Sequence, residues 1–203
     1  VSAFLLTRSS DLEIGAGALG SVTGKTTVTI ADDAIIGVEN KTGGNVYGAA
    51  RGKEGATVMG SNLANSLETE VNINGHSTDN TKAGAQVWGS VYGGGEAGNV
   101  KQSVLVSMTG GAVAKDVYGG GALADTQTNN WDATNNQWAN ATNTSTTYTT
   151  QVKLTGGTIG RSVYGGALGR KASEGVTEIS AKVYGDVTVS LNDNDGTCQV
   201  NGS

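Results

Sequence analysis

A short motif, Val-Tyr-Gly, recurs along this chain and constrains its fold more than any other feature. Copies lie at 46–48, 91–93, 117–119, 163–165 and 183–185, and a related Val-Trp-Gly lies at 87–89. The steps between successive Val-Tyr-Gly copies are 45, 26, 46 and 20 residues, so the longer steps are about twice the shorter ones. This spacing predicts a structural unit of about 20 to 26 residues, with degenerate copies filling the longer steps.

The two best copies of the unit align without a gap. Residues 104–124 match residues 150–170 through an alternating apolar segment, then Thr-Gly-Gly, then Val-Tyr-Gly-Gly. Segments such as TVTI, EVNI, SVLV, QVKL and DVTV alternate with period two, which is typical of strands with one buried face. No long segment carries a capped helical stripe. The sequence therefore predicts an all-β fold.

Repeats this short cannot bury an apolar face alone, so they must stack on one another. A parallel β-helix satisfies this need, since each unit becomes one coil whose strands pair with those above and below. Its corners require positive φ or close backbone approach, and we expect Gly94, Gly120 and Gly166 to lie at positive φ. Tyrosines at equivalent positions should then stack in a ladder. A propeller fits the doubled spacing but explains the short steps poorly.

One segment interrupts the repeat, and it is the most ligand-like part of the chain. We expect residues 125–149, rich in Thr and Asn, to form one long lateral loop on a single domain that spans residues 1–203. Trp131, Trp138 and Tyr148 are the candidate ligand contacts, because aromatic faces beside amides and hydroxyls bind sugars or anchor a partner protein. The alternative is that both tryptophans fold back onto the flank of the stack and hold the loop down.

Composition excludes several classes of protein. Glycine accounts for 33 of 203 residues but proline is absent, which excludes collagen. The net charge is −5 and no basic cluster is longer than Arg170-Lys171, so we expect no nucleic-acid partner. No apolar run reaches the roughly 20 residues of a membrane-spanning helix. The chain opens without Met or a signal-peptide pattern, so we interpret it as a fragment or mature part of a larger protein. The lone Cys198 is interpreted as a buried or incidental thiol.

The remaining motifs favour no catalytic, cofactor or metal site. Residues 15–20 match a dinucleotide fingerprint and residues 20–27 resemble a phosphate loop, but strand-like sequence follows both instead of a helix. Asp193 and Asp195 are spaced like calcium ligands, although an Asp-Gly turn is the preferred interpretation.

Catalytic groups are equally scarce. The only histidine, His76, is predicted to be a solvent-exposed loop residue with no nucleophile motif beside it. A carboxylate pair for sugar hydrolysis, such as Asp32 or Asp33 with Asp116, cannot be placed in space from the sequence.

At TGGAVAKDVYGGG (109–121) and TGGTIGRSVYGG (155–166), the sequence resembles the glycine-rich repeat regions of large autotransporter-like and adhesin-like proteins of Gram-negative bacteria. The resemblance covers most of residues 20–190 except the 125–149 segment. It implies a right-handed parallel β-helix of the pectin-lyase type and a location at the bacterial outer surface or outside the cell. Such regions serve mostly as stalks, passenger domains and adhesins.

We therefore expect a non-catalytic structural or adhesive module that presents loops to a glycan or a host-surface protein. Flanking repeats of the same polypeptide are a further expected partner. The alternative hypothesis is a polysaccharide-active enzyme, a lyase or glycosidase, on the same scaffold. Ice binding ranks last, because Thr-x-Thr patterns occur only sporadically.

Overall fold

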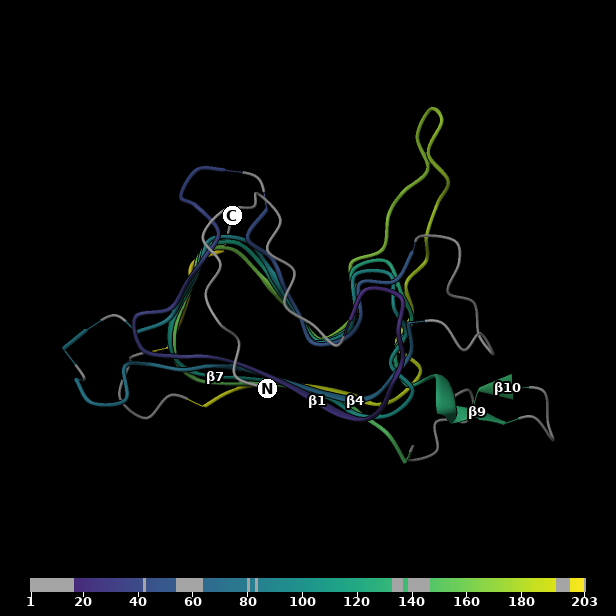
Figure 1. Ribbon diagram of the computed structural model, residues 1–203, viewed down its shortest axis with the longest axis horizontal. Helices are drawn as coiled ribbons and strands as arrows, with labels where there is room; N and C mark the ends of the chain where they lie inside the picture. The colour runs from purple at the N-terminus through teal and green to yellow at the C-terminus, as the bar shows by residue number, and fades with distance from the viewer. Residues whose placement is uncertain are drawn as a thin grey trace.

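Figure 1 shows the computed structural model of the chain, which describes residues 17–41, 43–53, 64–79, 81–82, 84–132, 137–138, 147–192 and 198–202. Within these ranges the fold is nearly all β with parallel sheets, and its one helical element is the short 3-10 turn η1 (Thr128–Asn130). The predicted all-β class is confirmed. The extent of the single domain over residues 1–203 stays a prediction.

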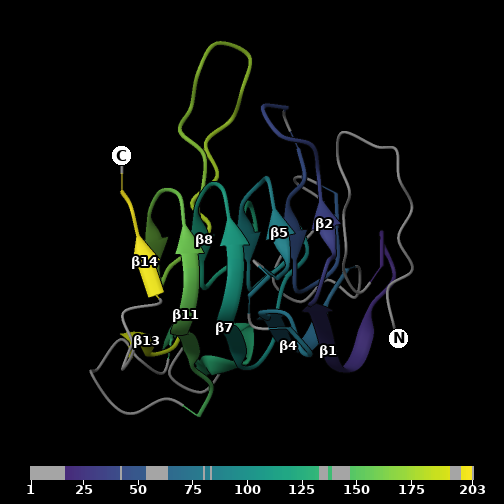
Figure 2. The same ribbon diagram turned by 90° about the vertical axis from the view of Figure 1, so that its left-hand side faces the viewer.

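The larger sheet is built from long strands that follow one another in chain order. Its central path is β1 (Val22–Ile30), β4 (Ser66–Ile73), β7 (Val104–Val113), β11 (Thr150–Ile159) and β13 (Val187–Leu191). Three short strands extend it: β2 (Ile35–Ile36), β5 (Gln86–Val87) and β14 (Cys198–Val200). Every pairing in this sheet is parallel, and Figure 2 shows the strands lying one beside the next.

A second sheet contains the Val-Tyr pairs of the sequence motif. Its strands are β3 (Val46–Tyr47), β6 (Val91–Tyr92), β8 (Val117–Tyr118) and β12 (Val163–Tyr164), all parallel. We call a pass the stretch from one long strand, through the following Val-Tyr strand, to the start of the next long strand. Successive passes therefore lie on one another through both sheets.

The pairing corrects the predicted length of the repeat. Val46 pairs with Val91, Val91 with Val117, and Val117 with Val163, so the steps are 45, 26 and 46 residues. The predicted unit of 20 to 26 residues is therefore wrong, because only the step from β6 to β8 is that short. The fifth Val-Tyr-Gly copy is also not equivalent, since Val183 forms an isolated bridge with Thr126 outside the second sheet.

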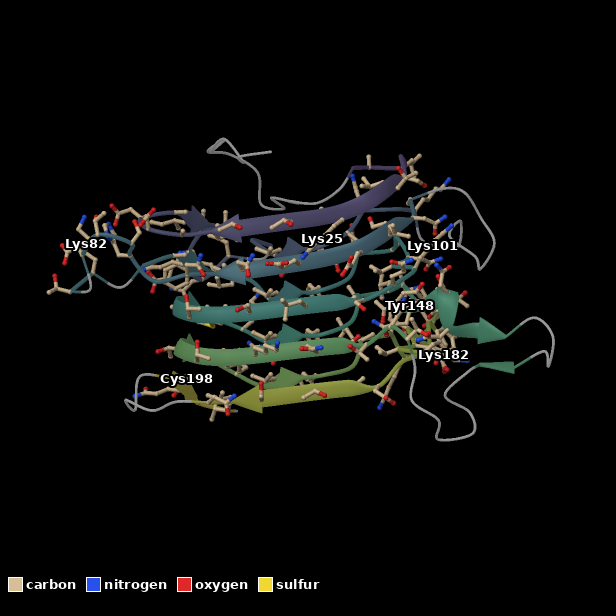
Figure 3. The ribbon with its side chains drawn as sticks, turned by 90° about the horizontal axis from the view of Figure 1, so that it is seen from below. Lys25, Lys82, Lys101, Tyr148, Lys182 and Cys198 are labelled. Atoms are coloured by element: carbon tan, nitrogen blue, oxygen red, sulfur yellow. The ribbon has the colours of Figure 1, made fainter. Side chains whose placement is uncertain are left out.

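Alternating apolar residues on the long strands fill the space between the sheets. Val71, Val106 and Val152 are register partners on β4, β7 and β11, and all three are fully buried. The opposite face of this sheet is polar, and the Lys25 ammonium forms an ion pair there with the Glu70 carboxylate (Figure 3). One buried and one solvated face explain the period-two pattern of the sequence. The predicted burial of Cys198 is confirmed.

The tyrosines of the Val-Tyr strands stack as the sequence predicts. Each neighbouring pair among Tyr47, Tyr92, Tyr118 and Tyr164 has ring centroids 5.0 Å apart, with interplanar angles of 11°, 5° and 14°. Each stacked pair contributes about 0.5 to 1.5 kcal/mol beyond the burial of area. The ladder also fixes the register of the second sheet, because a slip of one residue would replace every tyrosine by a valine.

A row of polar side chains precedes the Val-Tyr strands and links each pass to the next. Asn45 Oδ1 accepts a hydrogen bond from the Ser90 backbone N–H at 2.8 Å. Ser90 Oγ accepts from the Asp116 N–H at 3.4 Å, and Asp116 Oδ1 accepts from the Ser162 N–H at 3.1 Å. The backbone N–H group just before each of these Val-Tyr strands therefore donates to a side chain of the preceding pass.

The glycine prediction is wrong in its detail. Gly94, Gly120 and Gly166 do not lie in the left-handed region. Positive φ occurs instead at the second glycine of each Thr-Gly-Gly copy, Gly44 (72°), Gly111 (78°) and Gly157 (91°). These glycines supply the left-handed backbone that glycine adopts without a steric cost.

The glycine of the Val-Tyr-Gly motif has a different role, close approach between passes. A Cβ on Gly93 would lie 2.5 Å from Val104 Cγ1 and would overlap the carbonyl oxygen of Gly119 in the next pass. A Cβ on Gly119 would meet the carbonyl of Gly165 in the same way. These glycines allow adjacent backbones to pack at the spacing of paired strands.

The last pass exposes the apolar surface that earlier passes bury. Val189 on β13 is 47% exposed, whereas its register partner Val152 is 0% exposed. Tyr164, the last ring of the ladder, is 47% exposed, compared with 8% for Tyr118. The inner face of the stack is therefore open at this end among the described residues.

Candidate functional site

The lateral segment predicted from the sequence leaves the stack at Asp125. After η1 the chain forms an antiparallel hairpin of β9 (Trp131–Asp132) and β10 (Gln137–Trp138), which lies to one side of the stacked sheets (Figure 1). The segment rejoins the stack at the start of β11. It is thus an insertion between two passes whose strands remain in register.

Buried polar side chains hold the base of this segment. Gln127 is fully buried with a positive φ of 56°, and its amide nitrogen donates to Thr150 Oγ1 at 2.7 Å. The Asn130 amide nitrogen donates to the carbonyl oxygens of Tyr148 at 3.1 Å and Tyr184 at 3.3 Å. A left-handed glutamine persists only where its surroundings over-determine it, so the base is rigidly positioned.

The structure brings two of the three predicted contact residues together. Trp131 and Trp138 are register partners in the β9–β10 hairpin. Tyr148 lies at the base of the segment instead, where its partly buried hydroxyl accepts a hydrogen bond from the Gln102 amide at 3.2 Å (labelled in Figure 3). Ligand contact by these three residues stays a prediction.

A partly buried carboxylate lies beside the same base. Asp125 Oδ1 accepts from the Lys182 N–H at 2.8 Å, and Oδ2 accepts from the Tyr184 hydroxyl at 3.3 Å. Burial raises the pKa of Asp125, while the two hydrogen bonds act in the opposite direction. Burial and the nearby Asp125 charge raise the pKa of Tyr184 to about 12. These contacts tie the segment after β12 to the base of the hairpin.

His76 is not the exposed loop residue that the sequence predicts. Its side chain is 10% exposed, with Nε2 3.6 Å from Asp33 Oδ2 and Nδ1 4.0 Å from Asp32 Oδ1. Nδ1 accepts from the Asp79 N–H at 3.1 Å, which assigns the ring proton to Nε2. The prediction failed because both aspartates are more than 40 residues away in the sequence.

The contacts around His76 hold two loops together. The Ser77 backbone N–H donates to Asp32 Oδ1 at 2.7 Å, and the two hydrogen bonds from Ser77 lower the pKa of Asp32. Lys82 Nζ donates to Asp33 Oδ2 at 3.3 Å. The cluster joins the turn before β2 to the loop before β5. Within the described ranges, no group of three or more His, Cys, Asp or Glu side chains could hold a metal ion.

The suggested carboxylate pair belongs to two different structural clusters. Asp32 and Asp33 contact His76, whereas Asp116 accepts a hydrogen bond from Ser162 in the polar row described above. Asp116 therefore has a structural partner in the next pass. Asp193 and Asp195, the suggested calcium ligands, lie outside the described residues.

A pocket beside Trp88 was not predicted from the sequence. Trp88 follows β5 and occupies the same place in its pass as Gly37, Ala114 and Gly160 do in theirs. A pocket of about 200 Å³ lies where the large indole stands beside two small residues, at the end of β5 (labelled in Figure 2). Its lining is Gln86, Val87, Trp88, Ala112, Val113, Ala114, Thr158 and Gly160. Aligning the Val-Trp-Gly segment with the two best copies would have revealed the large-to-small contrast.

A second projection was also missed. Residues 170–179 form a narrow hairpin with isolated bridges Arg170–Ile179 and Ser173–Val176, and it rises well clear of the sheets (Figures 1 and 2). The Arg170 guanidinium donates to the Thr177 carbonyl oxygen through Nη2 at 2.9 Å. The Ser-Glu-Gly-Val turn, with Gly175 at φ 71°, is the local signal that could have identified it.

In the described part of the chain, no helix is long and apolar enough to cross a membrane. Comparisons with protein-family models, with curated proteins and with solved structures give no match for this chain. Proposals about its function therefore depend on the geometry above.

Proposed function

We propose that this chain is a right-handed parallel β-helix that acts as a non-catalytic structural or adhesive module. Parallel pairing of each pass with the next, in both sheets, supports the β-helix. The tyrosine ladder supports it further, because stacked rings at 5.0 Å require equivalent positions in successive passes. The handedness follows the general preference for right-handed parallel crossovers.

The observation that carries the functional proposal is the anchored β9–β10 hairpin. Trp131 and Trp138 are register partners in this hairpin, which lies to one side of the stack, and the sequence around them is rich in Asn and Thr. Gln127 and Asn130 fix its base through buried hydrogen bonds. A projecting loop on a rigid base binds with a smaller loss of conformational entropy than a free loop. Aromatic residues in a sequence rich in amides and hydroxyls suit a glycan or a host-surface protein.

An adhesive module of this kind acts at the bacterial outer surface or outside the cell. Flanking repeats of the same polypeptide are the partner favoured by the exposed inner face of the last pass. Val187, Val189 and Leu191 are apolar residues of β13 that are each more than two-fifths exposed. Another pass paired in register with β13 would bury them, as β11 covers Val104, Val106 and Met108 of β7.

The non-catalytic part of the proposal rests on the surroundings of the titratable groups. His76 Nδ1 accepts hydrogen bonds from the backbone of its own loop. Asp116 and Asp125 likewise accept from backbone N–H groups of neighbouring segments. These groups already serve as structural acceptors, which favours the module over the polysaccharide lyase or glycosidase.

Screening of the wild-type chain and the Trp131→Ala/Trp138→Ala variant on arrays of glycans and of host-surface proteins tests this function. We expect the wild type to bind at least one glycan or host-surface protein. The double alanine variant should bind at least about tenfold more weakly, with a melting temperature unchanged within about 2 °C. The matched Trp131→Phe/Trp138→Phe variant should retain most of the binding, because it keeps aromatic faces.

Three results would overturn the proposal. Absence of any ligand for the wild type removes the adhesive role. Lost stability with unchanged binding would mean that the tryptophans only clamp the segment. Cleavage of a polysaccharide by the wild type would establish the enzyme alternative.

A further inference from the structure

We propose that the pocket beside Trp88 is a second carbohydrate site, which takes one neutral sugar ring. The inference rests on the proposed adhesive function and deepens it, because it names a ligand class and a position away from the β9–β10 hairpin. Trp88 supplies the one aromatic ring of the lining, while Ala112, Ala114 and Gly160 leave the space in front of it open.

The chemistry of the lining favours a sugar. The apolar C–H face of a pyranose packs on an aromatic ring, while its hydroxyls can face the solvent at an open mouth. The surface that lines the pocket is almost wholly apolar, which suits that face of the ring, and Gln86 and Thr158 are the lining residues with polar side chains. None of the eight lining residues carries a charge, so the pocket complements a neutral ring rather than an acidic sugar or one with a free amino group.

The pocket is formed by backbone that is already fixed. The Trp88 N–H donates to the Ile36 carbonyl at 2.9 Å. The Ala114 N–H donates to Val87 at 2.8 Å, and the Gly160 N–H donates to Val113 at 2.8 Å. Three consecutive passes are thus held in register around the pocket. A preformed site binds without an ordering cost.

The size of the pocket depends on small residues beside the indole. Trp88, Ala114 and Gly160 are equivalent positions, so a larger residue at position 114 would occupy the space in front of the ring. Ala114 is partly exposed, which allows a larger side chain there without filling the core. Ala114→Leu therefore blocks the pocket while Trp88 remains in place.

The test is saturation-transfer NMR of the wild-type chain with methyl glycosides of glucose, galactose, mannose, fucose and N-acetylglucosamine. We expect at least one glycoside to bind, and both Trp88→Ala and Ala114→Leu to weaken that binding by at least about tenfold. Trp88→Phe, which keeps an aromatic face, and Ala114→Ser, which keeps a small residue, should bind within about threefold of the wild type. Melting temperatures identify any variant that has lost its fold. If Trp88→Ala does not fold, Ala114→Leu tests the pocket independently.

The outcomes separate this inference from the adhesive function. Glycoside binding that survives Ala114→Leu, or that is lost only with Trp131→Ala/Trp138→Ala, overturns the Trp88 site and leaves the adhesive function standing. Wild-type binding of indole but of none of the glycosides overturns the sugar chemistry and makes this an apolar side-chain pocket. Absence of any glycan or protein ligand on the arrays overturns the adhesive function itself.

Discussion

Adding one methyl group at Gly119 should destabilise the fold, whereas the same change at Gly166 should not. A Cβ at Gly119 would lie 2.5 Å from Thr150 Cγ2 and would overlap the Gly165 carbonyl oxygen. Carbon atoms in contact normally lie about 3.5 to 4.0 Å apart. Thr150 is fully buried and bonded to Gln127, so its side chain cannot turn away. The two passes must therefore separate locally to accommodate the methyl group.

The expected magnitude follows from two opposing effects. Overpacking a fixed site costs about 1 to 3 kcal/mol, and replacing Gly by Ala recovers about 0.4 to 1 kcal/mol through the unfolded chain. Gly119→Ala should therefore lower the free energy of unfolding by about 1 to 2 kcal/mol. At Gly166 no heavy atom lies within 4 Å of the added Cβ, and φ is not left-handed. Gly166→Ala should therefore be neutral or stabilising by up to about 1 kcal/mol.

Urea denaturation of both variants, followed by far-UV circular dichroism, measures the difference. For a chain of this length, 1 kcal/mol corresponds to about 2 to 4 °C in melting temperature. Gly119→Ala should therefore melt several degrees below Gly166→Ala. Equal unfolding free energies for the two variants would refute close approach as the reason for glycine in the Val-Tyr-Gly motif.

Two further predictions concern buried polar groups. Burial, and to a smaller extent the charge of Asp116, raises the pKa of Tyr118 to about 12. The pKa of Tyr184 is also raised to about 12. The unfolded value is about 10, so both contributions to stability are complete below pH 10 and decline between pH 10 and about 12. Phenolate absorbance from all six tyrosines rising together near pH 10 in the folded chain would contradict this. Gln127→Leu, which leaves the Thr150 hydroxyl without its donor, should cost about 1 to 3 kcal/mol in urea denaturation, and an unchanged midpoint would show that the base of the hairpin is held by other contacts.

Much of the scaffold could be predicted because its signals are local. The period-two apolar residues predicted the strands, and the recurring Val-Tyr motif predicted the tyrosine ladder. The length of the repeat could not be read in the same way, because the copy at 183–185 matches the motif without joining the second sheet. Glycine roles were also ambiguous, since sequence spacing does not distinguish the positive φ of Gly111 from the close approach of Gly119.

The sites were harder to predict because they depend on contacts between distant residues. His76 is covered by aspartates from another pass, and no periodic pattern links them. Trp88 was interpreted as part of a variant of the motif. The pocket beside it exists because Ala114 and Gly160, at the same place in the neighbouring passes, are small. The interruption of the repeat at residues 125–149 is itself a local signal, and the β9–β10 hairpin lies within it, while residues 133–136 and 139–146 lie outside the described residues.

The most direct test of the scaffold is a disulfide between neighbouring passes. Ser107 and Lys153 are register partners on the polar face of β7 and β11, and paired strands bring such Cα atoms to about 4.8 Å, within the range of a disulfide. Mild oxidation of Ser107→Cys/Lys153→Cys should give the cross-link in high yield, identified by mass spectrometry of proteolytic fragments. Ser107→Cys/Gln151→Cys, displaced by two residues to about 8 Å, should form little. A higher yield for the displaced pair, or none for either, would contradict parallel passes stacked in register.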